Sequence, residues 1–119
     1  MVIRMEMLKV VEEYYDDFLG YNNIVYEYYD DDRYLGEFKM FAETNYIHGL
    51  RISPWERRKG YGTRMLQALF AEHPHVTFTL HVEVTNEAAV AMYEKLGFEL
   101  VSTGMAWGRY AHEMIRRGV

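Results

Sequence analysis

The first twenty residues carry two overlapping hydrophobic patterns, one typical of a strand and one typical of a helix. Apolar side chains at positions 3, 5 and 7 alternate with polar ones, as they do along a strand. A second set recurs every three or four residues, as on one face of a helix: Met5, Leu8, Val11, Tyr15 and Phe18. We therefore predict a short strand over residues 2–7, followed by a helix that runs to about Leu19 and ends at Gly20.

Residues 21–52 indicate three strands. β-Branched and aromatic residues dominate Ile24–Tyr29 and Tyr34–Ala42, which favours a strand for each. The acidic run Asp30–Asp32 lies between them and predicts a solvent-exposed turn, so that the two strands form a hairpin. Tyr46–Ile52 has a similar composition and predicts a third strand, which ends just before Pro54.

Two helices are predicted in the second half of the chain. Residues 61–72 have helical periodicity, and His73, which precedes a proline, ends this helix. Its apolar face suits packing on a sheet and consists of Met65, Leu66, Leu69 and Phe70. Asn86 is a good N-cap for a second helix, which runs to Leu96 and stops at Gly97.

Further strands separate and follow these helices. Val76–Val84 is apolar and β-branched, as expected of a central strand that is covered on both faces. Phe98–Thr103 and Tyr110–Arg116 predict a final hairpin around Met105–Gly108. The order of elements predicts one α/β domain over residues 1–119, with three layers around a mixed, largely antiparallel sheet and helices on both of its faces.

The composition bounds the class of protein. Half of the residues are hydrophobic and 26% are charged, which is typical of a globular chain. No apolar run approaches the roughly 18 residues of a membrane helix, and no signal peptide is recognisable at the N-terminus, so we expect a soluble cytoplasmic protein that does not enter a membrane. Cysteine is absent, which excludes disulfides and thiolate chemistry. The five histidines lack metal-ligand spacing, so we predict no metal.

Charge is distributed unevenly along the chain. The net charge is −5, and residues 1–43 contain eleven acidic side chains against four basic ones. An acidic first part beside a locally basic loop suits a protein that binds a cationic substrate and an anionic cofactor, although an acidic, solvated surface explains the same pattern. No basic face emerges outside the loop, so we do not expect nucleic-acid binding.

The stretch Leu50–Thr63, L-R-I-S-P-W-E-R-R-K-G-Y-G-T, carries the clearest chemical signal. An apolar strand ends at a proline, three cations follow, and two glycines open an amphipathic helix. Glycine lets the backbone approach a ligand closely, and the free N–H groups at a helix start attract phosphate. The spacing does not fit the G-x-x-x-x-G-K-[ST] nucleotide loop, because no glycine stands five residues before Gly60.

Two sequence blocks resemble one known family. L-x-I-x-P-x-x-R-x-x-G-x-G ends at Gly62, and N-E-A-A-V-A-M-Y-E-K-L-G-F spans Asn86 to Phe98. Together they resemble the GCN5-related N-acetyltransferase (GNAT) family over about Tyr46 to Phe98, which implies the GNAT fold and binding of acetyl-coenzyme A (acetyl-CoA). The chain is short, like the small viral polyamine acetyltransferases of this family.

The resemblance implies where acetyl-CoA binds. In this family the strand that carries Leu50 and Ile52 pairs with the pantetheine arm, and Asn86 contacts that arm. Backbone amides at the start of the following helix hold the pyrophosphate. The residues implied for the loop are Arg57, Arg58, Lys59, Gly60, Tyr61, Gly62 and Thr63.

The resemblance also implies catalytic residues. Tyr93 corresponds to the tyrosine that protonates the departing thiolate, although it also fits the apolar face of a helix. Because an amine of pKa near 10.4 must lose a proton to attack, a general base is expected as well. His81 and His48 occupy positions where family members carry a glutamate or a histidine, and either one also fits a hydrogen-bonded core histidine.

The front of the chain departs from the family pattern. Only about twenty residues precede Ile24, where family members usually have two helices that shape the acceptor pocket. We expect a more open site, or one that a homodimer completes. The acceptor is expected to be a small polycation such as a diamine, bound by Glu27 and Glu83 on strands near the reacting centre. The alternatives are a protein N-terminus or lysine as acceptor, or a catalytically silent acyl-CoA-binding module.

Overall fold

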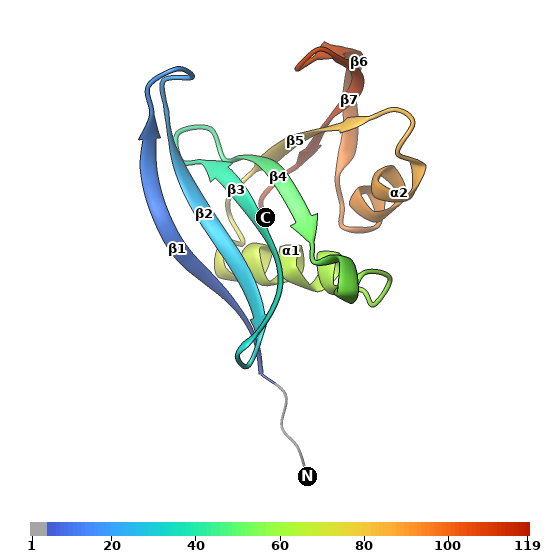
Figure 1. Cartoon of the computed structure of the whole chain (residues 1–119). Helices are drawn as coiled ribbons and strands as arrows, with labels where there is room; N and C mark the ends of the chain where they lie inside the picture. Colours follow the sequence, from blue (N-terminus) through green and yellow to red (C-terminus); the bar gives the residue numbers. More distant parts are fainter. Residues whose placement is uncertain (1–4) are drawn as a thin grey trace.

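One twisted sheet runs through residues 5–119, the part of the chain that the computed structural model describes (Figure 1). Its strand order is β1-β2-β3-β4-β5-β7-β6. The elements in chain order are β1 Glu6–Asp16, β2 Tyr21–Asp30, β3 Arg33–Phe41, β4 Tyr46–Ile52, the short 3₁₀ turn η1 Pro54–Glu56, α1 Tyr61–Glu72, β5 Phe78–Glu83, α2 Glu87–Lys95, β6 Glu99–Ala106 and β7 Arg109–Arg116. Among these residues no helix is long and apolar enough to cross a membrane.

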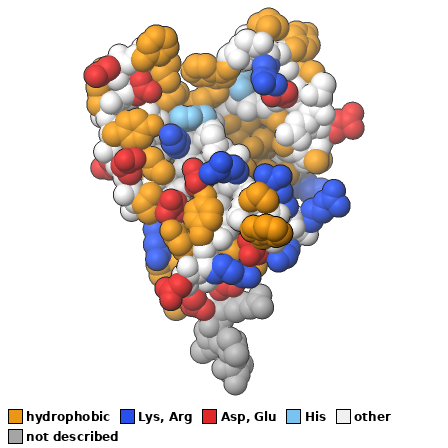
Figure 2. Space-filling view, viewed as in Figure 1, with side chains coloured by type: hydrophobic (Ala, Val, Ile, Leu, Met, Phe, Trp, Pro, Cys, Tyr) orange, Lys and Arg blue, Asp and Glu red, His pale blue; other side chains and the backbone are white. Residues whose placement is uncertain are grey.

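The sheet separates in its middle. Every neighbouring pair of strands is antiparallel except β4 and β5, which run parallel. These two strands pair only at Tyr46 with Thr79 and at Ile47 with Leu80, and beyond Ile47 they diverge. Figure 2 shows the resulting hollow at the upper end of the molecule, between the β1–β4 part and the β6–β7 hairpin. The predicted mixed, largely antiparallel α/β fold is confirmed.

Both helices of the described chain pack against the same face of the sheet. Phe70 of α1 contacts Phe78 of β5 and also Phe98. Tyr93 of α2 contacts Phe98 as well. Side chains of α1, α2 and this face of β5 belong to one hydrophobic core. The prediction of helices on both faces is therefore wrong in this respect, because most residues of the helix predicted up to Leu19 belong to strand β1 instead.

The other face of the sheet has no helix over it in residues 5–119 and carries the polar side chains of the centre. Cross-strand pairs place Tyr46 beside Phe41, His48 beside Lys39, and His81 beside Glu113 on this face. The side chains of Tyr46, His48 and His81 are half-buried. The fold thus leaves aromatic and titratable groups accessible on both sides of the β4–β5 opening.

The predicted helix before Gly20 is wrong, because residues 6–16 form strand β1. A bulge between Val10 and Glu12 shifts the alternation by one residue, and this shift produced the spacing that resembled a helix. Gly20 has φ +77° and donates its N–H to the Asp16 carbonyl, so it closes a hairpin turn. Residues 2–4 of the predicted first strand lie outside the described residues.

Most other predicted elements are confirmed. Tyr46–Ile52 and the helix over residues 61–72 have the predicted bounds, and the remaining strands differ by a few residues at their ends. Asn86 caps α2 as predicted, accepting the Ala89 N–H. The turn at residues 30–32 differs from the prediction in one respect. Asp30 is buried and pairs with Arg33, so only Asp31 and Asp32 of this turn are exposed to solvent.

Candidate functional site

The loop before α1 presents bare backbone to a groove of about 510 Å³. Gly60 has φ +81° and caps α1 without a side chain, and the first hydrogen bond of the helix runs from the Arg64 N–H to the Gly60 carbonyl. The N–H groups of Tyr61, Gly62 and Thr63 therefore have no acceptor within the helix. Together with the positive end of the helix dipole, they form a site suited to phosphate.

Gly62 lies between the Met92 side chain of α2 and the end of β4 beside this groove. A Cβ at Gly62 would lie 3.4 Å from the Met92 Sδ and 3.7 Å from Cγ1 of Ile52, so a side chain here would extend between the groove walls. The groove lining contains all the predicted loop and strand residues except Lys59: Leu50, Ile52, Arg57, Arg58, Gly60, Tyr61, Gly62 and Thr63. Apart from Lys59 and Asn86, the predicted cofactor residues are thus brought together around one groove.

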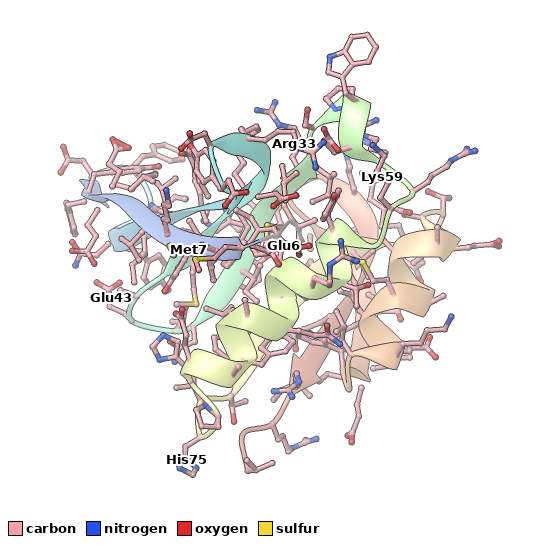
Figure 3. The ribbon with its side chains drawn as sticks, turned by 90° about the horizontal axis from the view of Figure 1, so that it is seen from below. Glu6, Met7, Arg33, Glu43, Lys59 and His75 are labelled. Carbon is pink, nitrogen blue, oxygen red and sulfur yellow. The ribbon has the colours of Figure 1, made fainter. Side chains whose placement is uncertain are left out.

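An ionic network anchors this loop to the β2–β3 turn. Glu56 is buried and pairs with Arg33 at 3.3 Å and with Lys59 at 3.2 Å. Arg33 also pairs with Asp30 and donates to the Tyr61 hydroxyl at 3.2 Å. Figure 3 shows Arg33 and Lys59 close together near the start of α1. Lys59 is therefore paired with Glu56 and does not line the groove.

Two arginines remain beside the groove. The Arg57 Nε–H donates to the Ile52 carbonyl at 3.2 Å, which holds the side chain along the end of β4. Arg58 is exposed and has φ +64°. Figure 2 shows basic side chains gathered over the loop before α1. This concentration of positive charge favours an anionic group beside the free helix N–H groups.

Tyr93 faces a smaller cavity at the point where β4 and β5 separate. The cavity has a volume of about 260 Å³, and its lining includes Leu50, His48, His81, Asn86 and Tyr93. Tyr93 is 7% exposed, and this burial raises the pKa of its phenol to about 12. No hydrogen bond to its hydroxyl is found in residues 5–119, so the group is a donor that keeps its proton across the physiological range.

Three hollows adjoin one another across the opening, and together they are called the path. The groove at α1 and the Tyr93 cavity share Leu50 and Ala89 in their linings. The Tyr93 cavity in turn shares His48 and His81 with a hollow of about 380 Å³ that reaches the β6–β7 turn at Trp107. A ligand that occupies the groove at one end and the last hollow at the other would pass Tyr93 on the way.

His48 is held in a defined tautomer by a buried amide. Its Nε2 lies 2.9 Å from the Oδ1 of Asn23, which is 1% exposed. Because a carbonyl oxygen only accepts hydrogen bonds, Nε2 carries the proton and Nδ1 keeps its lone pair. Burial, and secondarily the positive charge of Lys39, lowers the pKa of His48, so the ring stays neutral and able to accept a proton.

His81 belongs to a hydrogen-bonded chain that spans three elements. The Trp107 Nε1–H donates to the Tyr46 oxygen at 2.9 Å, and the Tyr46 hydroxyl lies 2.8 Å from the Nδ1 of His81. On the other side of the ring, the His81 Nε2 lies 3.7 Å from Oε2 of Glu113. Burial raises the pKa of Tyr46, whereas the hydrogen bond from Trp107 acts in the opposite direction.

The two predicted acceptor carboxylates lie in different places. Glu83 lines both the Tyr93 cavity and the adjoining hollow, and it pairs with Arg109 at 3.1 Å. Glu27 accepts a hydrogen bond from the Tyr29 hydroxyl at 2.7 Å and lies beside Lys9 on β1, away from these linings. The structure thus brings Glu83, and not Glu27, to the histidines.

Sequence reasoning missed Tyr46, Trp107 and Glu113. Tyr46 and His81 lie on the neighbouring strands β4 and β5, and the register of these strands brings them together. Trp107 approaches through a hairpin turn 61 residues further along the chain than Tyr46. Nothing in the local sequence pattern indicates that contact.

Comparison with known proteins agrees with this geometry. The model of the "Acetyltransferase (GNAT) family" matches residues 6–98. N-alpha-acetyltransferase 50 from Danio rerio is 36% identical over 56 residues, which cover 44% of this chain and 33% of that protein. The match therefore spans about a third of the curated relative's length.

Solved structures share the fold at low identity. The ribosomal-protein-S18-alanine N-acetyltransferase of Escherichia coli has a TM-score of 0.74 and 18% identity, covering 94% of this chain and 93% of that one. The spermidine N-acetyltransferase of Vibrio cholerae, solved with CoA and spermine, has a TM-score of 0.66 and 20% identity, covering 78% and 64%. Since the family model matches most of the chain, this protein belongs to the GNAT acetyltransferase family.

Proposed function

We propose that this protein transfers an acetyl group from acetyl-CoA to a primary amine. The observation that carries the proposal is the series of adjoining hollows from the free N–H groups of α1, past Tyr93, to the two histidines. One end of this path suits a pyrophosphate and the other end carries groups able to accept a proton. The GNAT structures that share the fold include one solved with CoA, which is consistent with this use of the groove.

The groove fits acetyl-CoA in its chemistry as well as its position. The helix N–H groups and Arg58 would hold the pyrophosphate, and the β5-facing edge of β4 past Ile47 would pair with the pantetheine amides. Acetyl-CoA supplies a thioester whose acetyl carbon is activated toward an amine. Asn86 lines the adjacent cavity, although its side-chain oxygen already accepts the Ala89 N–H, so its free amide NH₂ is the group available for contact.

Removal of the amine proton is assigned to the side of the opening that carries Tyr46, His48 and His81, which is called the acceptor side. An alkyl ammonium has a pKa near 10.4, so well under 1% of it is neutral at pH 7 and a base is required. Tyr46 would take this proton as its own proton passes to the His81 Nδ1, while the nearby Glu113 stabilises the imidazolium that results. The free Nδ1 of His48 is the second candidate base.

Tyr93 is assigned to the leaving group. As the new N–C bond forms and the C–S bond breaks, negative charge develops on sulfur, and a hydroxyl directed at it stabilises that charge. With a pKa of about 12, the buried phenol remains a donor at every working pH. This value lies above that of an ordinary thiol, near 8.5, so Tyr93 keeps its proton and stabilises the departing thiolate as a hydrogen-bond donor.

Two acceptor classes follow from different observations. A small polycation such as a diamine is favoured by Glu83 and Glu113 beside the histidines, and a spermidine N-acetyltransferase shares the fold. A protein N-terminus is favoured by the aromatic walls of the last hollow and by the identity with N-alpha-acetyltransferase 50. The kinship with small viral polyamine acetyltransferases stays a prediction.

Release of free CoA thiol tests the proposal. The full chain would be incubated with acetyl-CoA and a panel of monoamines, diamines, polyamines, lysine peptides and peptides with free N-termini. We expect amine-dependent thiol release with at least one class, and mass spectrometry should show one added acetyl group on that amine. Binding of acetyl-CoA without thiol release for any amine would contradict the proposal and favour a silent acyl-CoA-binding module.

A further inference from the structure

Trp107 occupies an unusual position for a large aromatic residue. It lies with Gly108 in the two-residue turn between β6 and β7, where Ala106 pairs with Arg109. Both turn residues have positive φ, +54° for Trp107 and +76° for Gly108. Such turns favour Asn, Asp or Gly at these positions, and positive φ is unfavourable for a bulky side chain. The indole is therefore held here against the local backbone preference.

The indole has a defined polar contact despite its exposure. Trp107 is 65% exposed, yet its Nε1–H donates to the Tyr46 oxygen at 2.9 Å, and the two rings lie 6.5 Å apart. The contact joins the β6–β7 turn to β4 across the opening in the sheet. It forms in the hollow that contains His48 and His81, so it bears directly on the proposed acceptor side.

This one donor favours one direction for the whole hydrogen-bonded chain. An indole N–H only donates, so the Tyr46 oxygen must accept and its own proton is free for His81. If His81 carried its proton on Nδ1, the Tyr46 oxygen would have to accept a second N–H beside that of the indole. Donation from Tyr46 to the His81 Nδ1, 2.8 Å away, avoids this and leaves the ring proton on Nε2 facing Glu113. Without the indole, Tyr46 and His81 are able to exchange donor and acceptor roles, and the chain loses its direction.

We propose that Trp107 is a positioning residue that orients the Tyr46 hydroxyl toward His81 and thereby holds His81 in its Nε2–H tautomer. The reversed chain would place a proton on Nδ1, where it blocks the transfer from Tyr46. The role of this tautomer in catalysis rests on the proposed acetyl transfer, whereas the tautomer itself is a property of the protein alone. Trp107 therefore acts through Tyr46 and needs no contact with the acceptor.

The first test uses Trp107→Phe, which keeps an aromatic ring in the turn and removes only the N–H donor. Long-range ¹H–¹⁵N NMR of the histidine rings reports the tautomer in the absence of any substrate. We expect the Nε2–H form of His81 in the native chain and a mixture of tautomers in the variant. Trp55→Phe is the matched control, because Trp55 is 87% exposed in η1 and should leave the His81 signals unchanged.

The second test is a double-mutant cycle on the rate of acetyl transfer. Trp107→Phe should lower kcat about tenfold, a part of the 10²–10⁴-fold that acid–base catalysis contributes, with the KM for acetyl-CoA unchanged. In a Tyr46→Phe background the same change should cost nothing further, because the hydroxyl it orients is gone. Additive losses would overturn the proposal and make Trp107 a wall of the acceptor pocket.

The two tests separate this proposal from the proposed function. An unchanged His81 tautomer in Trp107→Phe overturns the positioning role, whatever the activity of the native chain. A changed tautomer, in a native chain that releases no CoA thiol with any amine, supports the positioning of His81 and contradicts the proposed acetyl transfer alone. An Nδ1–H tautomer in the native chain also overturns the positioning role, because the hydrogen bonds would then run in the opposite direction.

Discussion

The proposed cofactor side and the proposed acceptor side of the opening are built in different ways. The cofactor side consists mainly of backbone from one continuous stretch, β4 through the start of α1, and the ionic network of Glu56 holds that stretch in place. The acceptor side consists of side chains from four separate strands or turns, which include Tyr46, His81 and Trp107. Backbone groups at a helix start recognise phosphate without a particular side chain, whereas proton transfer depends on specific side chains.

The largest effect on cofactor binding is expected for a charged side chain in the backbone site. Gly60→Asp places a carboxylate beside the phosphate site and a non-glycine residue at φ +81°. We expect the Kd for acetyl-CoA to rise by about 100-fold or more, equivalent to about 2.7 kcal/mol. Isothermal calorimetry would measure it.

Gly20→Asp is the matched control for Gly60→Asp. Gly20 also has a positive φ, +77°, but it lies in the β1–β2 turn away from the groove. This control should lose thermal stability through the same backbone strain and keep its affinity for acetyl-CoA. Unchanged calorimetric binding in Gly60→Asp would mean that the α1 loop is not the phosphate site.

The next effect concerns Tyr93, which lies between the two regions. Tyr93→Phe keeps the buried ring and removes the hydroxyl, so kcat should fall by 10²–10⁴-fold while the Kd for acetyl-CoA stays the same. Steady-state kinetics with calorimetry would test both. Tyr15→Phe, a change at a half-exposed tyrosine of β1, serves as the control. A near-native kcat in Tyr93→Phe would reduce Tyr93 to a packing residue.

The same contrast explains what could be predicted from the sequence. The cofactor side follows from Leu50–Thr63 alone, because strand, glycines and helix start are contiguous in the chain. The hydrogen bonds that join Trp107, Tyr46 and His81 depend on strand register and on a distant turn, which no local sequence pattern specifies. β1 was mistaken for a helix because the bulge after Val10 disturbed the alternation on which a strand prediction depends.

A smaller effect is expected for charge on the acceptor side. Glu83 lies in the path and is 46% exposed with Arg109 beside it, so Glu83→Gln should raise the KM for a diamine by only a few-fold. A monoamine of equal length should be less affected, because it has no distal ammonium to hold. Glu27→Gln and Asp31→Asn should have no effect on either KM. A larger effect of Glu27→Gln would place the acceptor on the other part of the sheet.

The smallest effect is a pH dependence of stability. Burial and Lys39 lower the pKa of His48 below its usual 6.5, so the unfolded chain takes up this proton before the folded one. The stability contribution of neutral His48 is therefore complete above about pH 6.5 and declines as the pH falls toward the folded-state pKa. The Tm of the native chain should decrease more steeply between pH 7 and 5 than that of His48→Gln. Equal slopes in thermal melts would contradict this account.

The central claim is that one region binds acetyl-CoA and the other removes the amine proton. It is tested most directly by measuring acetyl-CoA affinity and single-turnover acetyl transfer on the same preparation of Tyr46→Phe. The variant keeps the ring that packs beside Phe41 and removes the hydroxyl that contacts His81. With the best amine of the panel, the Kd for acetyl-CoA should be native, and the transfer step should be slowed by about 10²-fold. A weakened Kd, or a native transfer rate with a native Kd, would contradict the assignment of proton removal to the Tyr46–His81 pair.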